Sequence, residues 1–99
     1  MKRSIPKVKR QTLIALAEAL VSVETAEEME RFLQEVLTPA ELRDITLRWQ
    51  LLDLLVQGIP QRKIADGLQI SLCKITRGSR ILKKQKSVCL KILTKGEAK

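Results

Sequence analysis

The apolar residues of this 99-residue chain recur at steps of three and four residues, and no segment alternates as a half-buried strand does. A period near 3.6 places such residues on one face of a helix, so we expect an all-α fold. Thr25 stands three residues before Glu28, and Thr38 stands three before Glu41 with a proline between them. Both patterns predict the start of a helix. Gly58 is expected to end the second of these helices in a left-handed conformation.

The expected helices cover about residues 8–22, a short segment after Thr25, and residues 39–57. The third is apolar on two faces, one of which carries Leu42, Ile45, Trp49, Leu52 and Val56 and the other Leu47, Leu51, Leu54 and Leu55. A helix that is apolar on two faces is buried on two sides. Because the remaining helices barely cover both, we expect a homodimer, with a tightly wrapped monomer as the alternative.

Charge is distributed unevenly along the chain, which carries +8 in all. Residues 1–10 carry +5, residues 11–31 carry −4, residues 32–56 carry −2 and residues 57–99 carry +9. Two basic blocks that flank an acidic middle favour a polyanion such as nucleic acid over a merely basic surface. The first block is a basic arm, expected to attract phosphates without regard to sequence. Its residues are Lys2, Arg3, Lys7, Lys9 and Arg10.

Several functions are excluded by what the chain lacks. It contains no histidine, no paired carboxylates in an apolar stretch and no Gly-rich phosphate loop, so we expect neither an enzyme nor a metal site. Cys73 and Cys89 lie sixteen residues apart, which matches no metal or redox motif and indicates a reduced, cytoplasmic chain. We expect no signal peptide and no membrane span. Aromatic residues are only 2% of the chain, too few for stacking single-stranded nucleic acid.

The segment after Gly58 has the pattern of a helix-turn-helix element. We expect a short helix over residues 61–66, a turn over 67–71 and a second helix over 72–80. The few apolar contacts expected to hold this pair together come from Ile64, Leu68, Leu72 and Ile75, with the small Ala65 at the crossing. Polar and basic residues along the outer face of the second helix favour DNA binding over a helical hairpin inside a bundle.

The chain resembles the bacterial tryptophan repressor family over about residues 10–93. The resemblance rests on Leu37-Thr38-Pro39-Ala40-Glu41-Leu42-Arg43, Arg48, Gln61-Arg62 and Ile75-Thr76-Arg77-Gly78-Ser79. It implies an all-α, intertwined homodimer with six helices per chain and a helix-turn-helix element. It also implies L-tryptophan as corepressor, no other cofactor, and double-stranded operator DNA of tryptophan biosynthesis or transport genes as partner. The chain would form a single domain with an arm (1–10), a dimerisation core (11–57), a DNA reader (58–83) and a C-terminal helix and tail (84–99).

For the ligand, the resemblance implies that Arg48 and Arg77 sandwich the indole ring, while Arg77 also pairs with the carboxylate. Thr38 would lie near that carboxylate, although capping alone also explains this residue. Backbone carbonyls around Glu35 and Leu37 would accept from the ammonium group, and these turn residues would come from the other chain.

At other positions of the ligand site, a residue has a second explanation or the sequence differs from the family pattern. Gly78 stands where a side chain would collide with the ligand, although close helix packing also explains a glycine. Ile81 replaces a small hydroxyl residue beside the ammonium group, which predicts weaker tryptophan binding or a preference for a related indole. Gly67 precedes Leu68, whereas the family places its glycine after the leucine, and the loop before Pro60 is one residue shorter. These changes leave the operator sequence open.

For DNA, we expect base-facing residues at the start of the second helix and phosphate contacts around it. The expected DNA-binding residues are Gln61, Arg62, Ser71, Leu72, Cys73, Lys74, Thr76, Arg77 and Lys83. Among them, Lys74 is suited to guanine and Cys73 to a thymine methyl. A DNA-binding protein of the same superfamily that needs no ligand, and an interaction module that binds no duplex DNA, are the competing functions.

Overall fold

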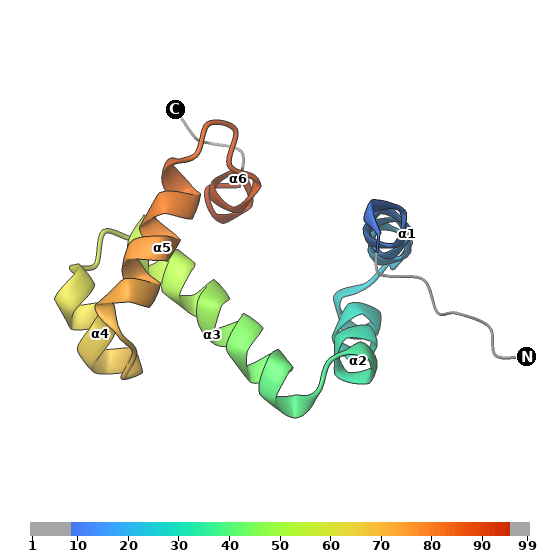
Figure 1. Ribbon diagram of the computed structural model, residues 1–99, viewed down its shortest axis with the longest axis horizontal. Helices are drawn as coiled ribbons and strands as arrows, with labels where there is room; N and C mark the ends of the chain where they lie inside the picture. Colours follow the sequence, from blue (N-terminus) through green and yellow to red (C-terminus); the bar gives the residue numbers. More distant parts are fainter. Residues whose placement is uncertain (1–8, 96–99) are drawn as a thin grey trace, which may run out of the picture. The chain divides into compact units, whose positions relative to one another are not determined.

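The structure, a computed structural model, describes residues 9–95, so residues 1–8 of the expected basic arm and 96–99 of the tail lie outside it. Within that range it contains six α-helices and no strand (Figure 1). The helices are α1 (Arg10–Val21), α2 (Ala26–Val36), α3 (Pro39–Val56), α4 (Gln61–Leu68), α5 (Leu72–Lys83) and α6 (Val88–Leu93). The all-α prediction is confirmed. The chain divides into two compact units, Met1–Pro39 and Ala40–Lys99.

In the first unit, α2 begins with the expected capping box. The Thr25 hydroxyl oxygen accepts a hydrogen bond from the Glu28 amide at 3.1 Å. The Glu28 carboxylate reaches back to the Glu24 amide at 3.4 Å, one residue before the cap itself. Together they satisfy two backbone donors at the helix start, and the carboxylate also interacts favourably with the helix dipole there.

The two helices of the first unit leave much of their apolar surface exposed. Neither α1 nor α2 contains a buried residue, and Leu13 is 62% exposed. Ile14, Leu16, Val21 and Val36 are exposed as well. An amphipathic helix gains its stability in water by burying such a face. Exposed apolar residues of this kind are typical of a surface that a partner covers.

In the second unit, α3 ends where the sequence predicts. Gly58 has a φ of +84°, and its amide donates to the Leu55 carbonyl at 3.1 Å. The Ile59 amide donates to the Leu54 carbonyl at 3.2 Å. This pattern satisfies the last carbonyls of the helix and requires a residue that tolerates positive φ. The prediction that Gly58 ends the helix is confirmed.

The core of the second unit lies where α3, α4 and α5 meet. Its centre consists of Leu51, Ile64 and Ile75, of which Ile75 is 0% exposed. Around them pack the half-buried residues Leu54, Leu55, Ile59, Ala65, Leu68 and Ile70. Helix α5 also packs against α6. The core thus fixes the position of α5 relative to the C-terminal half of α3.

Helices α5 and α6 each begin at a capping serine. The Ser71 hydroxyl accepts from the Lys74 amide at 3.4 Å, and the Ser87 hydroxyl accepts from the Leu90 amide at 3.1 Å. These caps satisfy donors that have no partner within the helix. Ser71 therefore has a structural role at the start of α5, whatever else it contacts.

Helices α4 and α5 are both longer than the sequence predicts, and α5 extends to Lys83 where an end at residue 80 is expected. A helix over 61–66 and a turn over 67–71 are expected, but α4 continues through Gly67 to Leu68, and the turn shrinks to residues 69–71. Leu72 is expected to be one of the apolar contacts between the two helices, and this prediction is wrong. Its side chain is 48% exposed and lies outside the core.

The residue that turns the chain is Gln69 and not Gly67. Gln69 takes the left-handed conformation with a φ of 54°, and the Ile70 amide donates to the Ala65 carbonyl at 3.1 Å. A non-glycine residue pays about 1 kcal/mol or more for this conformation. Packing of Ile64 and Leu68 in the core fixes where the helix must end, and this overrides the local preference for glycine.

Gly67 is therefore a helical glycine with no structural need for its flexibility. A Cβ built on Gly67 meets nothing within 4 Å, whereas one on Gly78 comes within 3.2 Å of a Leu55 methyl carbon. We expect Gly67→Ala to raise the free energy of unfolding by about 0.5–1 kcal/mol, measured by urea unfolding at fixed protein concentration. Gly78→Ala is the matched control. Its free energy of unfolding should rise by less, because the added methyl group crowds side chains of α3. An equal gain in both variants would contradict this account.

Within residues 9–95, none of the helices combines the length and apolar character that crossing a membrane requires.

Candidate functional site

A small pocket of about 110 Å³ lies between α3 and α5 of the second unit. It is lined by Asp44, Leu47, Arg48, Leu51, Ile70, Lys74, Arg77, Gly78 and Ile81. Apolar side chains from both helices line it together with charged ones. The structure therefore brings Arg48 and Arg77, which are far apart in the sequence, to the same pocket.

The charges of this pocket are unbalanced. Three cationic side chains, Arg48, Lys74 and Arg77, accompany one carboxylate, that of Asp44. Neither guanidinium group is hydrogen-bonded or ion-paired to another residue in the described part of the chain. Guanidinium groups bind carboxylates through paired hydrogen bonds and stack on aromatic rings. The pocket therefore suits a small molecule with an apolar aromatic part and an anionic group.

Gly78 is buried at the crossing of α5 and α3. A Cβ built on it would meet side-chain carbons of Leu55 at 3.2 Å, Leu51 at 3.3 Å and Leu52 at 3.4 Å. Close helix packing therefore accounts for the glycine by itself. Because Gly78 also lines the pocket, a bulkier residue there would disturb both the helix crossing and the pocket wall.

Not every residue expected at the ligand site belongs to this unit. Glu35, Leu37 and Thr38 lie in the first unit, so the pocket described here is formed without them. Their expected contacts with a ligand stay predictions. Ile81 is half-buried and does line the pocket, where it presents an aliphatic wall.

Sequence reasoning missed several lining residues of this pocket. Asp44 and Leu51 stand four residues before and three after Arg48, and Lys74 stands three before Arg77. Residues three and four apart share a helix face, so this spacing was a usable signal. From its place at the start of the second helix, Lys74 is expected to contact bases, yet it also lines this pocket.

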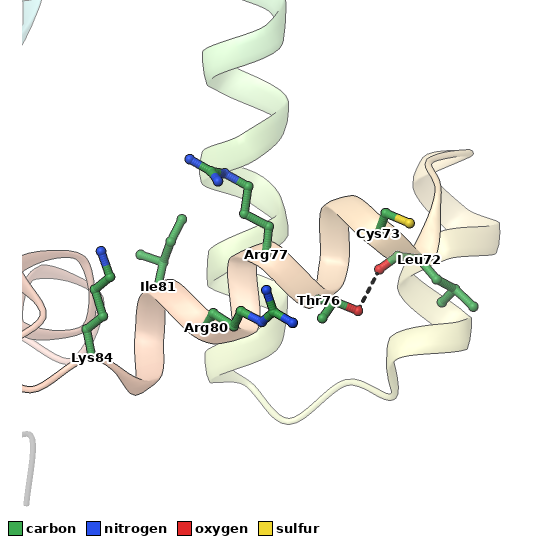
Figure 2. A pocket seen from close by; sticks show the side chains of 7 residues that line it. All are labelled: Leu72, Cys73, Thr76, Arg77, Arg80, Ile81 and Lys84. Carbon is green, nitrogen blue, oxygen red and sulfur yellow. Dashed lines mark hydrogen bonds between the residues drawn. The ribbon is translucent and has the colours of Figure 1, made fainter.

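A second hollow, an open groove, runs along the outer face of α5 (Figure 2). Its lining residues are Leu72, Cys73, Thr76, Arg77, Arg80, Ile81 and Lys84. The Thr76 hydroxyl donates a hydrogen bond to the Leu72 carbonyl of its own helix at 2.9 Å (Figure 2). While this bond is in place, the hydroxyl can accept a hydrogen bond from another group but cannot donate one. Arg77 lines both this groove and the pocket against α3.

The residues expected to bind DNA share one property: all of them are exposed. They are Gln61, Arg62, Ser71, Leu72, Cys73, Lys74, Thr76, Arg77 and Lys83, and they lie on α4, on α5 or in the turn between. Leu72, Cys73, Thr76 and Arg77 line the groove. Gln61 and Lys83 line a separate hollow near the C-terminal end of α3. Their contacts with DNA stay predictions.

Comparison with known proteins assigns the chain to a family. The model of the Trp repressor protein family matches residues 11–97. The chain belongs to the Trp repressor family. A Trp operon repressor homolog of Actinobacillus succinogenes is 44% identical to it over 55 residues, which cover 54% of this chain and 54% of that protein. The chain thus spans about half the length of the curated relative it matches. No solved structure gives a significant match.

The Trp repressor family is a family of transcription regulators and not an enzyme family. Membership also agrees with the resemblance carried by the Thr-Pro-x-Glu and Ile-Thr-Arg-Gly-Ser strings.

Proposed function

We propose that this chain is an L-tryptophan-dependent transcriptional repressor, which binds a palindromic operator of tryptophan biosynthesis or transport genes as a homodimer. The observation that carries the proposal is the pocket between α3 and α5, in which Arg48 and Arg77 accompany apolar residues of both helices. Membership in the Trp repressor family supports the same function.

The pocket suggests how tryptophan is held. The indole ring lies between the Arg48 and Arg77 guanidinium groups, against Leu47 and Leu51, and Arg77 also pairs with the carboxylate. In this proposal the backbone carbonyls near Glu35 and Leu37 of the partner subunit accept from the ammonium group. Thr38 of the partner subunit lies near the carboxylate.

Exposed apolar residues support the homodimer. Helices α1 and α2 bury no residue within the chain, and on α3 Ile45 is 47% and Trp49 is 41% exposed. A second copy of the chain supplies apolar surface of the same kind. In a two-fold dimer, the two copies of α5 would enter successive major grooves about 34–36 Å apart.

The place of the pocket suggests how the ligand controls DNA binding. A ligand between α3 and α5 contacts both helices and so biases the orientation in which α5 is presented. If only that orientation fits the major groove, ligand and operator raise each other's affinity through one coupling free energy, typically about 1–3 kcal/mol.

Calorimetric titration with L-tryptophan tests the corepressor role. We expect Arg48→Ala and Arg77→Ala each to weaken binding at least about tenfold, because each removes a charge-assisted or stacking contact, worth more than about 1.4 kcal/mol. Arg43→Ala is the matched control: it removes the same exposed side chain from α3 outside the pocket and should bind like the wild type. Equal heats for all four proteins would contradict a tryptophan clamp at these arginines.

A related indole is the alternative ligand, and Ile81 is the observation that favours it. Its aliphatic side chain lines the pocket and offers no hydrogen bond to an ammonium group. In the same calorimeter, tighter binding of indole-3-propionate than of L-tryptophan would favour this alternative. A gel shift that is unchanged by either compound at fixed salt would instead indicate a ligand-independent DNA-binding protein.

A further inference from the structure

Two cations in the groove along α5 lie outside the ligand pocket. Arg80 is one of the basic residues on the outer face of α5 that favour DNA binding, but neither Arg80 nor Lys84 belongs to the set of DNA-binding residues named from the sequence. Arg80 and Lys84 line the groove toward the C-terminal end of α5, beyond Arg77 (Figure 2). Both are exposed, and neither lines the pocket against α3.

The surrounding chain does not neutralise them. Residues 67–95 contain eight Lys or Arg and no Asp or Glu. No hydrogen bond or ion pair joins the Arg80 or Lys84 side chain to another of the residues that the structure describes. The groove therefore has an uncompensated positive charge, and its occupant is expected to be anionic.

The spacing of the cations indicates an extended anion and not a single small one. Arg77 and Arg80 stand about one helical turn apart on α5, and Lys84 caps its C-terminal end, so the three cations line the groove one after another. With a rise of 1.5 Å per residue, the row is about 10 Å long. A DNA strand presents its phosphates as a regular, closely spaced series, so a row of this length has the reach of neighbouring phosphates on one strand.

We propose that Arg80 and Lys84 contact the phosphate backbone of DNA, and so extend the DNA contact along α5 beyond the base-facing residues at its start. This inference rests on the proposed function. Arg80 also lies in the last turn of α5, where a cation stabilises the helix through its dipole. Its test must therefore separate DNA contact from helix stability.

The salt dependence of DNA binding makes this separation. Affinity for a short mixed-sequence duplex is measured by fluorescence anisotropy over a salt series with saturating L-tryptophan. Removing one cation from a phosphate reduces the slope of log affinity against log salt by about 0.9. We therefore expect a reduction of about 1.8 for Arg80→Ala or for Lys84→Ala in a two-fold dimer, and about 3.6 for the double variant.

Three controls accompany the measurement. Arg80→Lys keeps the charge and should retain the wild-type slope. Lys91→Ala removes an exposed cation of α6 outside the groove and should leave the slope unchanged. The double variant should bind L-tryptophan like the wild type, because neither residue lines the ligand pocket.

The possible failures are distinguishable. If the wild type does not bind duplex DNA, both the proposed function and this inference are wrong. If the wild type binds DNA and the double variant has the same salt slope as the wild type, only the proposed phosphate contacts are wrong. The groove then binds another anionic partner or none. A lower melting temperature with an unchanged slope would assign Arg80 to helix stability alone.

Discussion

Ile75→Ala is expected to lower the free energy of unfolding by about 2–5 kcal/mol. Ile75 is 0% exposed and lies at the centre of the core with Leu51 and Ile64. Alanine removes three carbon atoms and leaves a cavity where α3, α4 and α5 meet. Because total stability of a small domain is only about 5–15 kcal/mol, a large part of it would disappear. Urea unfolding at one fixed protein concentration measures the change.

Leu72→Ala is the matched control for this experiment. Leu72 is also an aliphatic residue of α5, but it is 48% exposed and lies outside the core. We expect its replacement to change the free energy of unfolding by no more than about 0.5 kcal/mol. If the two variants were equally stable, the assignment of the core to the Ile75 side of α5 would be wrong.

Ile45→Asp is expected to weaken the proposed homodimer by a factor of about 100 or more. Ile45 is 47% exposed on α3, one turn before Trp49, and forms part of the apolar surface that a partner chain would cover. A carboxylate buried there without a counter-charge costs on the order of 3 kcal/mol or more. Sedimentation analysis over a dilution series measures the dissociation constant.

The same variant has a spectroscopic readout and a control. Trp49 is the single tryptophan of the chain, so its fluorescence should shift to longer wavelength as the dimer dissociates and exposes it. Gln50→Asp introduces the same charge at an exposed, polar position of α3 and should leave the dimer intact. A wild type that sediments as a monomer at all concentrations would contradict the homodimer itself.

Helix starts and stops were the most predictable features of this fold. The Thr25 cap and the left-handed Gly58 are confirmed because each depends on atoms within a few residues of itself. The turn before α5 was predicted incorrectly for the opposite reason. Core packing of α4 determines where that helix ends, and Gln69 takes the left-handed conformation although Gly67 is better suited to it.

The ligand pocket was predictable only in part. The resemblance to the family named Arg48 and Arg77, and the structure places both on one pocket. It did not name Asp44 or Ile70, and Lys74 was expected to face DNA although it lines this pocket. Neighbours on the same helix follow from the helical period, but neighbours across two helices depend on how these helices cross.

By itself, the sequence determined the helical class of this protein, most of its helix ends and the concentration of positive charge after Gly58. These properties follow from local hydrogen bonding and from composition. Only the tertiary structure decided that α5 crosses α3 at Gly78, with Arg48 and Arg77 on one pocket and Arg80 and Lys84 along the outer groove. That arrangement depends on side-chain packing around Ile75, which joins residues far apart in the chain.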